Sequence, residues 1–180
     1  MTNGHSTGTK LHVEASARVH GPGAEVYRMI ADYRSGHPRI VPPKYFRDLR
    51  VVAGGYGDGT AIEFDVLAFG KVMHFRASVT EPEPGRVLEE RNLNDGSVTR
   101  FIVEPAGSST SRVTIASDRP LERTGVLGWF EGALTRTFLR RIYAQQLARL
   151  DEQVQLDLQR AASEAVGASG LDSGERAAAE

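Results

Sequence analysis

The fold depends most on residues 121–158, LERTGVLGWFEGALTRTFLRRIYAQQLARLDEQVQLDL. This is the longest helical pattern in the chain. Pro120 ends the preceding segment, Glu122 places a carboxylate in the first turn, and Leu, Ala, Arg and Gln fill the body. An unbroken helix of this length would be roughly 55 Å long, whereas a compact domain of this size is about 40 Å across. We therefore expect the helix to bend, break or extend beyond the domain.

The apolar residues of this helix fall on two nearly opposite faces when each residue turns the helix by about 100°. The first face holds Leu127, Phe130, Leu134, Phe138 and Ile142, and the second holds Leu139, Tyr143, Leu147, Leu150, Val154 and Leu158. We favour a kink near Gly132 that turns the first face inward, because three glycines weaken this part of the helix. The alternative is a straight helix whose first face and nearby arginines meet an anionic membrane or a second copy of the chain.

The composition of the chain indicates one soluble domain of ordinary size. The chain has 180 residues, 40 % of them hydrophobic, a formal net charge of -1 and no cysteine. The near-neutral charge argues against a nucleic-acid binder, and the lack of cysteine excludes disulfides and thiolate metal sites. No apolar run approaches the roughly 20 residues of a membrane span, and the first residues do not form a secretory signal. We expect a cytoplasmic protein without a cofactor.

The two ends of the chain differ from its middle. Residues 1–10 are small and polar, which predicts a disordered arm, and residues 160–180 lose large apolar side chains and gain Gly and Ser, which predicts a flexible tail. The folded domain is then residues 11–159.

The middle of the chain reads as strands interrupted by two short helices. Residues 11–19 alternate apolar and polar side chains, which is typical of a strand with one buried face. Pro22 opens a short helix over residues 24–33, and Gly36, Pro38 and the Pro42–Pro43 pair leave room for one further turn of helix. Six more strands follow, separated by turn sequences, over residues 45–52, 60–68, 71–79, 86–92, 97–104 and 112–117.

One hairpin can be aligned from its chemistry. If its turn is centred on Phe69-Gly70, each of five strand residues faces a complementary partner: Leu67 faces Val72, Val66 faces Met73, Asp65 faces His74, Phe64 faces Phe75 and Glu63 faces Arg76. The apolar residues then share one face and the charged pairs the other. The hairpin at Asp95-Gly96 leaves two registers open, because one places Arg91 opposite Arg100 and a one-residue shift places Glu89 there.

This order of elements favours an α+β domain in which a curved antiparallel sheet of about seven strands wraps around the long C-terminal helix. The chain resembles the polyketide cyclase/dehydrase and lipid-transport family of the START-related SRPBCC superfamily, which has the helix-grip fold. The matching segments are GPGAEVYRMIADYRSGHPRIVP at 21–42, GDGTAIEF at 57–64, EPEPGRVLEE at 81–90, TRFIVEPAGSSTSRVTI at 99–115 and LARLDE at 147–152. The resemblance implies a cavity between sheet and helix that holds an apolar small molecule.

Histidines and carboxylates do not form a metal site in this pattern. One histidine lies in the N-terminal arm, two lie on the polar face of the first strand, and His74 faces Asp65. His37 stands in the loop sequence SGHPRI, either in solvent or at the mouth of a cavity. No residue belongs to a diagnostic catalytic motif.

Two functions follow from these observations. The first is binding or carriage of a lipid, polyketide or aromatic compound, in a cavity lined by Ile62, Phe64, Val66, Met73, Phe75, Phe130 and Leu134. The second is a polyketide cyclase/dehydrase-like enzyme, in which a few polar groups move protons. For that role we nominate Tyr27, His37, Tyr56 and Arg136.

Overall fold

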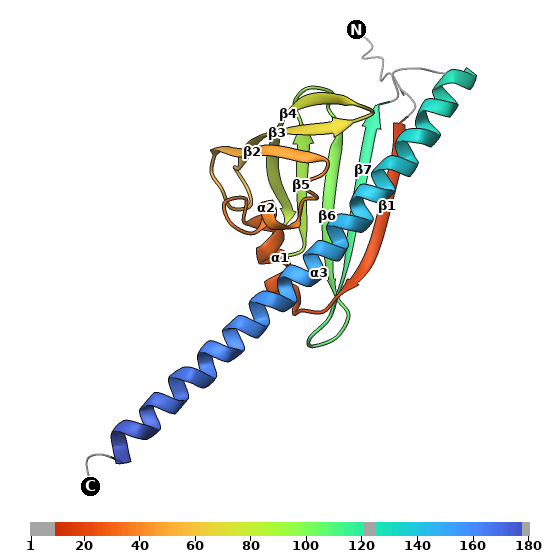
Figure 1. Cartoon of the computed structure of the whole chain (residues 1–180). Coiled ribbons are helices and arrows are strands. Elements are labelled where there is room, and N and C mark those ends of the chain that lie inside the picture. The colour runs from red at the N-terminus through yellow and green to blue at the C-terminus, as the bar shows by residue number, and fades with distance from the viewer. Residues whose placement is uncertain (1–9, 121–124, 178–180) are drawn as a thin grey trace.

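The protein folds into a seven-stranded sheet that curves around one long helix (Figure 1). The computed structural model describes the backbone of residues 10–120 and 125–177, and the side chains of residues 10–120 and 132–166. The strands are β1 (Lys10–Val19), β2 (Phe46–Ala53), β3 (Ala61–Ala68), β4 (Lys71–Glu83), β5 (Val87–Asn92), β6 (Val98–Pro105) and β7 (Ser111–Pro120). The helices are α1 (Gly23–Ala31), α2 (His37–Ile40) and α3 (Gly125–Ala177). The helix-grip fold predicted from the sequence is confirmed.

The sheet order is β1-β7-β6-β5-β4-β3-β2, and every neighbouring pair is antiparallel. Strand β1 therefore lies at one edge of the sheet beside β7, the chain then crosses to β2 at the opposite edge, and β2 to β7 follow one another as a meander. The two short helices occupy the crossing between β1 and β2 (Figure 1). The concave face of the sheet is left for α3.

The hairpin between β3 and β4 has the predicted register at all five pairs, from Leu67 and Val72 to Glu63 and Arg76. Phe69 and Gly70 have φ values of 51° and 75°, the left-handed conformations that a tight type I′ turn needs. On the outer face, His74 Nδ1 lies 2.8 Å from Asp65 Oδ1. Complementary pairing and turn geometry thus specify the same alignment.

The hairpin between β5 and β6 adopts the shifted register, in which Glu89 faces Arg100. Arg100 Nε donates a hydrogen bond to Glu89 Oε2 at 2.9 Å, and Arg91 pairs with Val98 instead of facing a second arginine. The alternative left open by the sequence is therefore settled by charge, because like charges directly opposite each other destabilise a sheet.

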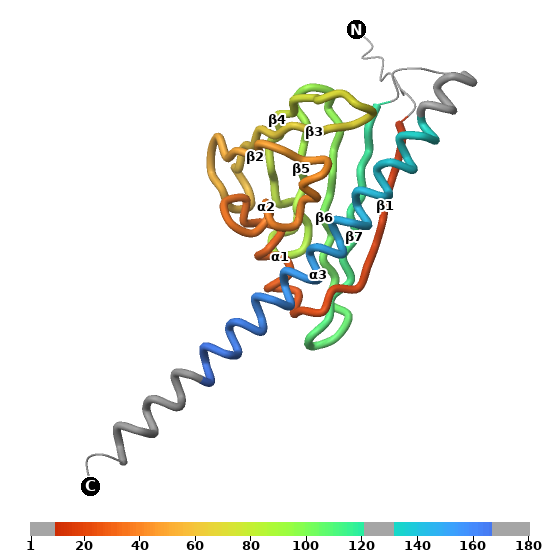
Figure 2. Tube along the Cα trace, viewed as in Figure 1, coloured from red at the N-terminus to blue at the C-terminus, as the bar shows by residue number. Residues whose placement is uncertain are grey.

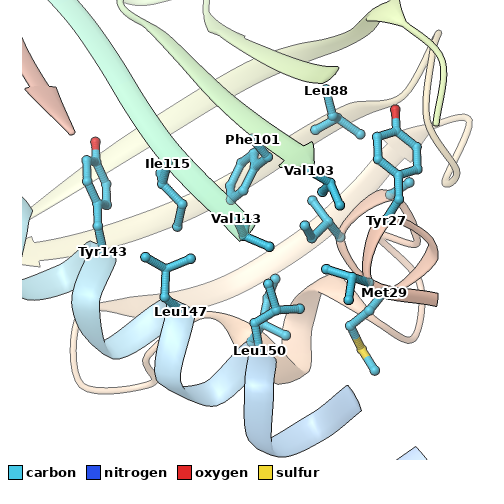
Figure 3. Close-up of a cluster of buried hydrophobic side chains, with 14 of the residues drawn as sticks. Tyr27, Met29, Leu88, Phe101, Val103, Val113, Ile115, Tyr143, Leu147 and Leu150 are labelled. Carbon is cyan, nitrogen blue, oxygen red and sulfur yellow. The ribbon is translucent and has the colours of Figure 1, made fainter. Parts of the chain in front are cut away.

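The second apolar face of α3 packs into the concave face of the sheet. Its buried side chains are Tyr143, Leu147, Leu150 and Val154, each at most 6 % exposed, and Ile142 of the first face is buried beside them. They join residues of β1, β5, β6, β7 and α1 in one hydrophobic core, part of which is drawn in Figure 3. Burying a side chain of this size stabilises the fold by about 1.5–3 kcal/mol. This contact fixes the helix against the sheet.

The predicted kink near Gly132 is wrong, because α3 runs as one helix from Gly125 to Ala177 (Figure 1), and its part over residues 132–166 is straight in Figure 2. Phe138 still faces inward, with its ring centroid 5.4 Å from that of Tyr45 and 5.0 Å from that of Phe69. Leu134 is 59 % exposed. Phe138 and Ile142 lie beside the second face, so the apolar stripe shifts gradually and the helix need not bend to bury them. The side chains of Leu127 and Phe130 lie outside the described residues.

Helix α3 also continues beyond residue 159, where we expected the folded domain to end, as far as Ala177. It extends well past the sheet at its C-terminal end (Figure 1). All side chains from Gln159 to Val166 are exposed. The predicted overhang is therefore present.

These positions give a matched pair of variants on α3. Phe138→Ser should lower the free energy of unfolding by about 1–3 kcal/mol, because it removes a partly buried ring, while Leu134→Ser should change it by less than about 0.5 kcal/mol. Urea unfolding followed by circular dichroism measures both values. Equal effects would mean that Phe138 does not pack as described.

An ion pair attaches α2 to α3. Arg39 donates from Nη1 and Nη2 to the two carboxylate oxygens of Asp157, each at 2.8 Å, and from Nε to Gln153 Oε1 at 3.0 Å. These hydrogen bonds and the positive charge of Arg39 lower the pKa of Asp157. The pair holds the short helix, and with it His37, beside the long one.

Replacing Asp157 with Asn should reduce stability at pH 7 by about 1 kcal/mol, because the pair is only partly exposed and has two parallel hydrogen bonds. Since the folded pKa is below the unfolded value of about 3.9, this contribution is present above that pH and is lost as pH falls through the folded pKa. Urea unfolding of both proteins at pH 7 and at pH 3 measures it. A stability difference that grows on acidification would contradict this assignment.

Candidate functional site: the cavity between sheet and helix

A cavity of about 600 Å³ lies between the concave face of the sheet and α3. Its volume is within the usual range of small-molecule sites, about 300–1,000 Å³. The packed core of Figure 3 closes one end, where Leu147 and Leu150 approach the sheet. The cavity therefore occupies the half of the concave face that the helix does not fill.

Strands β2, β3 and β4 make one wall of the cavity apolar. Its lining side chains are Phe46, Leu49, Ile62, Phe64, Val66, Met73 and Phe75. Phe64 and Phe75 face each other across the hairpin, with ring centroids 5.6 Å apart and ring planes 15° apart. From α3, Phe138, Leu139 and Ile142 complete this wall. It suits a flat apolar or aromatic body.

Strands β5, β6 and β7 place a row of polar side chains on the opposite wall. Glu90 pairs with Thr99, and Thr99 pairs with Ser117, so the three residues lie in line on neighbouring strands. We call these three residues the polar row, and all of them line the cavity. Thr99 Oγ1 and Ser117 Oγ are 2.7 Å apart, and Ser117 also hydrogen-bonds the hydroxyl of Tyr143 from α3. The cavity thus has one apolar and one polar side.

Glu90 is the charged member of the polar row. The buried hydroxyl of Tyr33 donates to Glu90 Oε1 at 2.5 Å. Burial raises the pKa of Tyr33 well above its ordinary value, and the negative charge of Glu90 raises it further. Tyr33 therefore remains a hydrogen-bond donor at any physiological pH, and it holds one carboxylate oxygen in place.

His37 lies beside this carboxylate and is only 2 % exposed. Its ring stacks on Tyr33 at a centroid distance of 4.4 Å and meets the Phe101 ring edge-on at 5.4 Å. Nδ1 is 2.7 Å from the carbonyl oxygen of Ile30, which can only accept, so Nδ1 carries a hydrogen. Nε2 is 3.6 Å from Glu90 Oε1. The solvated-loop interpretation of His37 is wrong, because these two rings enclose it.

The structure places the predicted apolar residues mostly as expected. Ile62, Phe64, Val66, Met73 and Phe75 line the cavity. Leu134 does not line it, because its position on α3 turns the side chain to solvent. The side chain of Phe130 lies outside the described residues.

Of the four nominated polar groups, only His37 lines the cavity. Tyr27 is buried elsewhere and donates its hydroxyl to Glu81 Oε1 at 2.5 Å. Tyr56 is 55 % exposed beside α1, and Arg136 lies on an exposed side of α3. The periodicity of β and α elements does not show which loops and which helix faces reach a cavity, and for that reason these three residues lie away from this one.

Sequence reasoning missed Glu90, Thr99, Ser117, Tyr143 and Gln146 as cavity residues. A signal for Glu90 was present. It alternates with Glu89 and Arg91 and shares a face with the buried Leu88 and Asn92. A carboxylate on the apolar face of a strand is unusual and often functional.

Two further features bear on the chemistry. Among the described residues, no group of three or more His, Cys, Asp or Glu side chains is arranged to hold a metal ion. Within the same part of the chain, no helix has both the length and the apolarity needed to cross a bilayer.

A family profile described as polyketide cyclase / dehydrase and lipid transport matches residues 10–155. The chain belongs to this family. The matched range contains both walls of the cavity, from β1 to the part of α3 that packs on the sheet. No curated protein matches the chain.

Solved structures share this fold along almost their whole length. The NMR structure of KanY protein is 25 % identical, with a TM-score of 0.71, and the match covers 82 % of this chain and 99 % of KanY. The Zhui aromatase/cyclase from a Streptomyces species is 17 % identical, with a TM-score of 0.67 and coverage of 82 % and 94 %. A START superfamily protein from Mycobacterium smegmatis is 14 % identical, with a TM-score of 0.63 and coverage of 81 % and 97 %. The predicted membership of the START-related superfamily is confirmed.

Two adjacent residues of β3 test which face of the sheet lines the cavity. Phe64→Asp should lower the free energy of unfolding by several kcal/mol and abolish binding of an apolar fluorescent probe, because it places a carboxylate against the apolar wall. Asp65→Asn removes only an exposed pair and should cost about 0–1 kcal/mol. Urea unfolding and probe titration measure both effects. Equal stability and equal binding of the two variants would reverse the facing assignment.

Proposed function

We propose that this protein binds a hydrophobic small molecule with one polar end in the cavity between sheet and helix. The observation that carries the proposal is the division of the cavity into an apolar wall from β2 to β4 and a polar row from β5 to β7. A purely apolar ligand would leave the second oxygen of the Glu90 carboxylate without a partner, and a purely polar one would gain nothing from the phenylalanines. The family description, which includes lipid transport, supports the same function.

The proposal includes a setting for this binding. We place the protein in the cytoplasm, and the near-neutral net charge of -1 supports a small-molecule partner rather than a nucleic acid. Association of two copies through α3 remains a prediction, supported by the exposed Leu134.

A neutral fluorescent probe tests binding directly. N-phenyl-1-naphthylamine should bind saturably and with a blue-shifted emission, because the phenylalanine wall removes it from water. Fluorescence titration of the wild type measures this, with Asp65→Asn as the control that leaves the cavity intact. Native mass spectrometry of protein purified from its own host should also show an added mass from a bound lipid or aromatic compound. A linear, unsaturable probe signal together with unliganded protein would overturn the proposal.

The second candidate function is a cyclase-type enzyme. It is favoured by one observation, the placement of the Glu90 carboxylate and the His37 imidazole side by side in the cavity lining, with Tyr33 donating to Glu90. Such groups can accept and return protons while the cavity holds a flexible chain in a folded form. One of the similar structures is an aromatase/cyclase. Cyclisation of a poly-β-ketone thioester analogue faster than in buffer would favour the enzyme, and binding without turnover would favour the carrier.

A further inference from the structure

The polar side of the cavity contains hydrogen-bond acceptors that lack donors. Tyr33 donates to Glu90 Oε1, but no described residue donates a hydrogen bond to Oε2 of the same carboxylate. His37 uses Nδ1 on the carbonyl oxygen of Ile30, and its Nε2 has no hydrogen-bond partner among the described residues. Both atoms belong to residues that line the cavity. Neither atom is sealed inside the protein, so the molecule that occupies the cavity must supply its partner.

Gln146 supplies an independent observation from the opposite element. It is on α3, only 4 % exposed, and its side chain lines the cavity. Within the described part of the chain no residue hydrogen-bonds its amide, which is open to the cavity. The amide can both donate and accept. It therefore offers the donor that Glu90 and His37 do not.

The remaining charges of the cavity lining largely neutralise each other. Arg119 Nη2 lies 3.4 Å from Asp95 Oδ2, so this pair adds little net charge. Glu90 is thus the acidic group that a ligand meets at the polar row, with His37 beside it.

We infer that the ligand is a neutral apolar molecule that carries a hydroxyl group, such as a phenol or an enol. The hydroxyl hydrogen is donated to the Glu90 carboxylate, beside His37, and the hydroxyl oxygen accepts from the amide of Gln146. The apolar body lies against Phe64 and Phe75. This inference rests on the proposed function, since it names the class of molecule that the same cavity takes.

Other polar ends fit these groups less well. A carboxylate would bring a second negative charge beside Glu90 in a largely apolar site, where like charges repel strongly. An ether has no hydrogen to donate and would leave the Glu90 carboxylate without this donor. A cationic amine could pair with Glu90, but it would lose its hydration on entering the cavity. A neutral hydroxyl gives Glu90 a donor without carrying a charge inside.

Four compounds with one ring system separate these alternatives. We would measure binding of 2-naphthol, 2-methoxynaphthalene, 2-naphthoate and 2-(aminomethyl)naphthalene to the full chain by isothermal titration calorimetry at pH 7. The naphthol should bind roughly ten to a hundred times more tightly than the methoxy compound, the factor that a hydrogen bond to a charged group contributes. The carboxylate and the amine should both bind more weakly than the naphthol.

Two neighbouring carboxylates of β5 provide a matched pair of variants. Glu90→Gln should remove most of the preference for the naphthol and leave the affinity for the methoxy compound nearly unchanged. Glu89→Gln should alter neither affinity, because Glu89 bonds to Arg100 and Arg91 on the other face of the sheet. Circular dichroism checks folding. If Glu90→Gln does not fold, Gln146→Leu should reduce the naphthol preference, and the comparison of compounds on the wild type decides without any variant.

Each outcome has a defined meaning. If none of the four compounds binds, the proposed function fails together with this inference. If the naphthol and the methoxy compound bind equally, the inference is overturned while the proposed function stands. Tighter binding of the carboxylate or the amine, or an unchanged naphthol preference in a folded Glu90→Gln variant, would also overturn it.

Discussion

The packing of the second apolar face of α3 onto the concave sheet determines the rest of the structure. Leu147 and Leu150 enter the core beside Val113 and Ile115, and this end of the interface is dry (Figure 3). Towards its N-terminus the same helix lines the cavity with Phe138, Leu139 and Ile142. One helix thus closes the core at one end and forms a wall of the cavity at the other. No separate lid or second domain is needed to build the site.

The polar row provides polar groups for function but lowers the stability of the fold. Strand positions that face a concave core are normally apolar, and a Glu there needs a donor to offset the loss of its hydration. Tyr33 supplies that donor, and the ion pair between Arg39 and Asp157 holds the adjacent α2 against α3. These tertiary contacts therefore serve to hold a carboxylate inside the domain. This arrangement is typical of binding and catalytic sites rather than of structural cores.

Features that depend on contacts between residues close in sequence were predicted correctly, and features that depend on contacts between distant segments were missed. The β3–β4 hairpin was predicted residue by residue, because Phe69-Gly70 and the pairs around it are local. The polar row was missed, because Glu90, Thr99 and Ser117 come together only through the order of three strands. His37 was recognised as a polar group of the cavity, but its burial depends on rings brought by other elements. Leu134 was misplaced since a rotation of one helical position decides between cavity and solvent.

The overhang of α3 has a consequence for how this protein unfolds. Residues from Gln159 to Val166 are helical and exposed, so little tertiary packing supports these roughly two turns of helix. Isolated helical segments of this length are marginal in water and exchange with coil on a scale of about a microsecond. The overhang and the domain therefore unfold in separate equilibria. The helical circular dichroism signal reports the unfolding of both, whereas a spectroscopic probe within the sheet reports the unfolding of the domain alone. The two measured unfolding transitions therefore need not coincide, even though the domain has a single cooperative core.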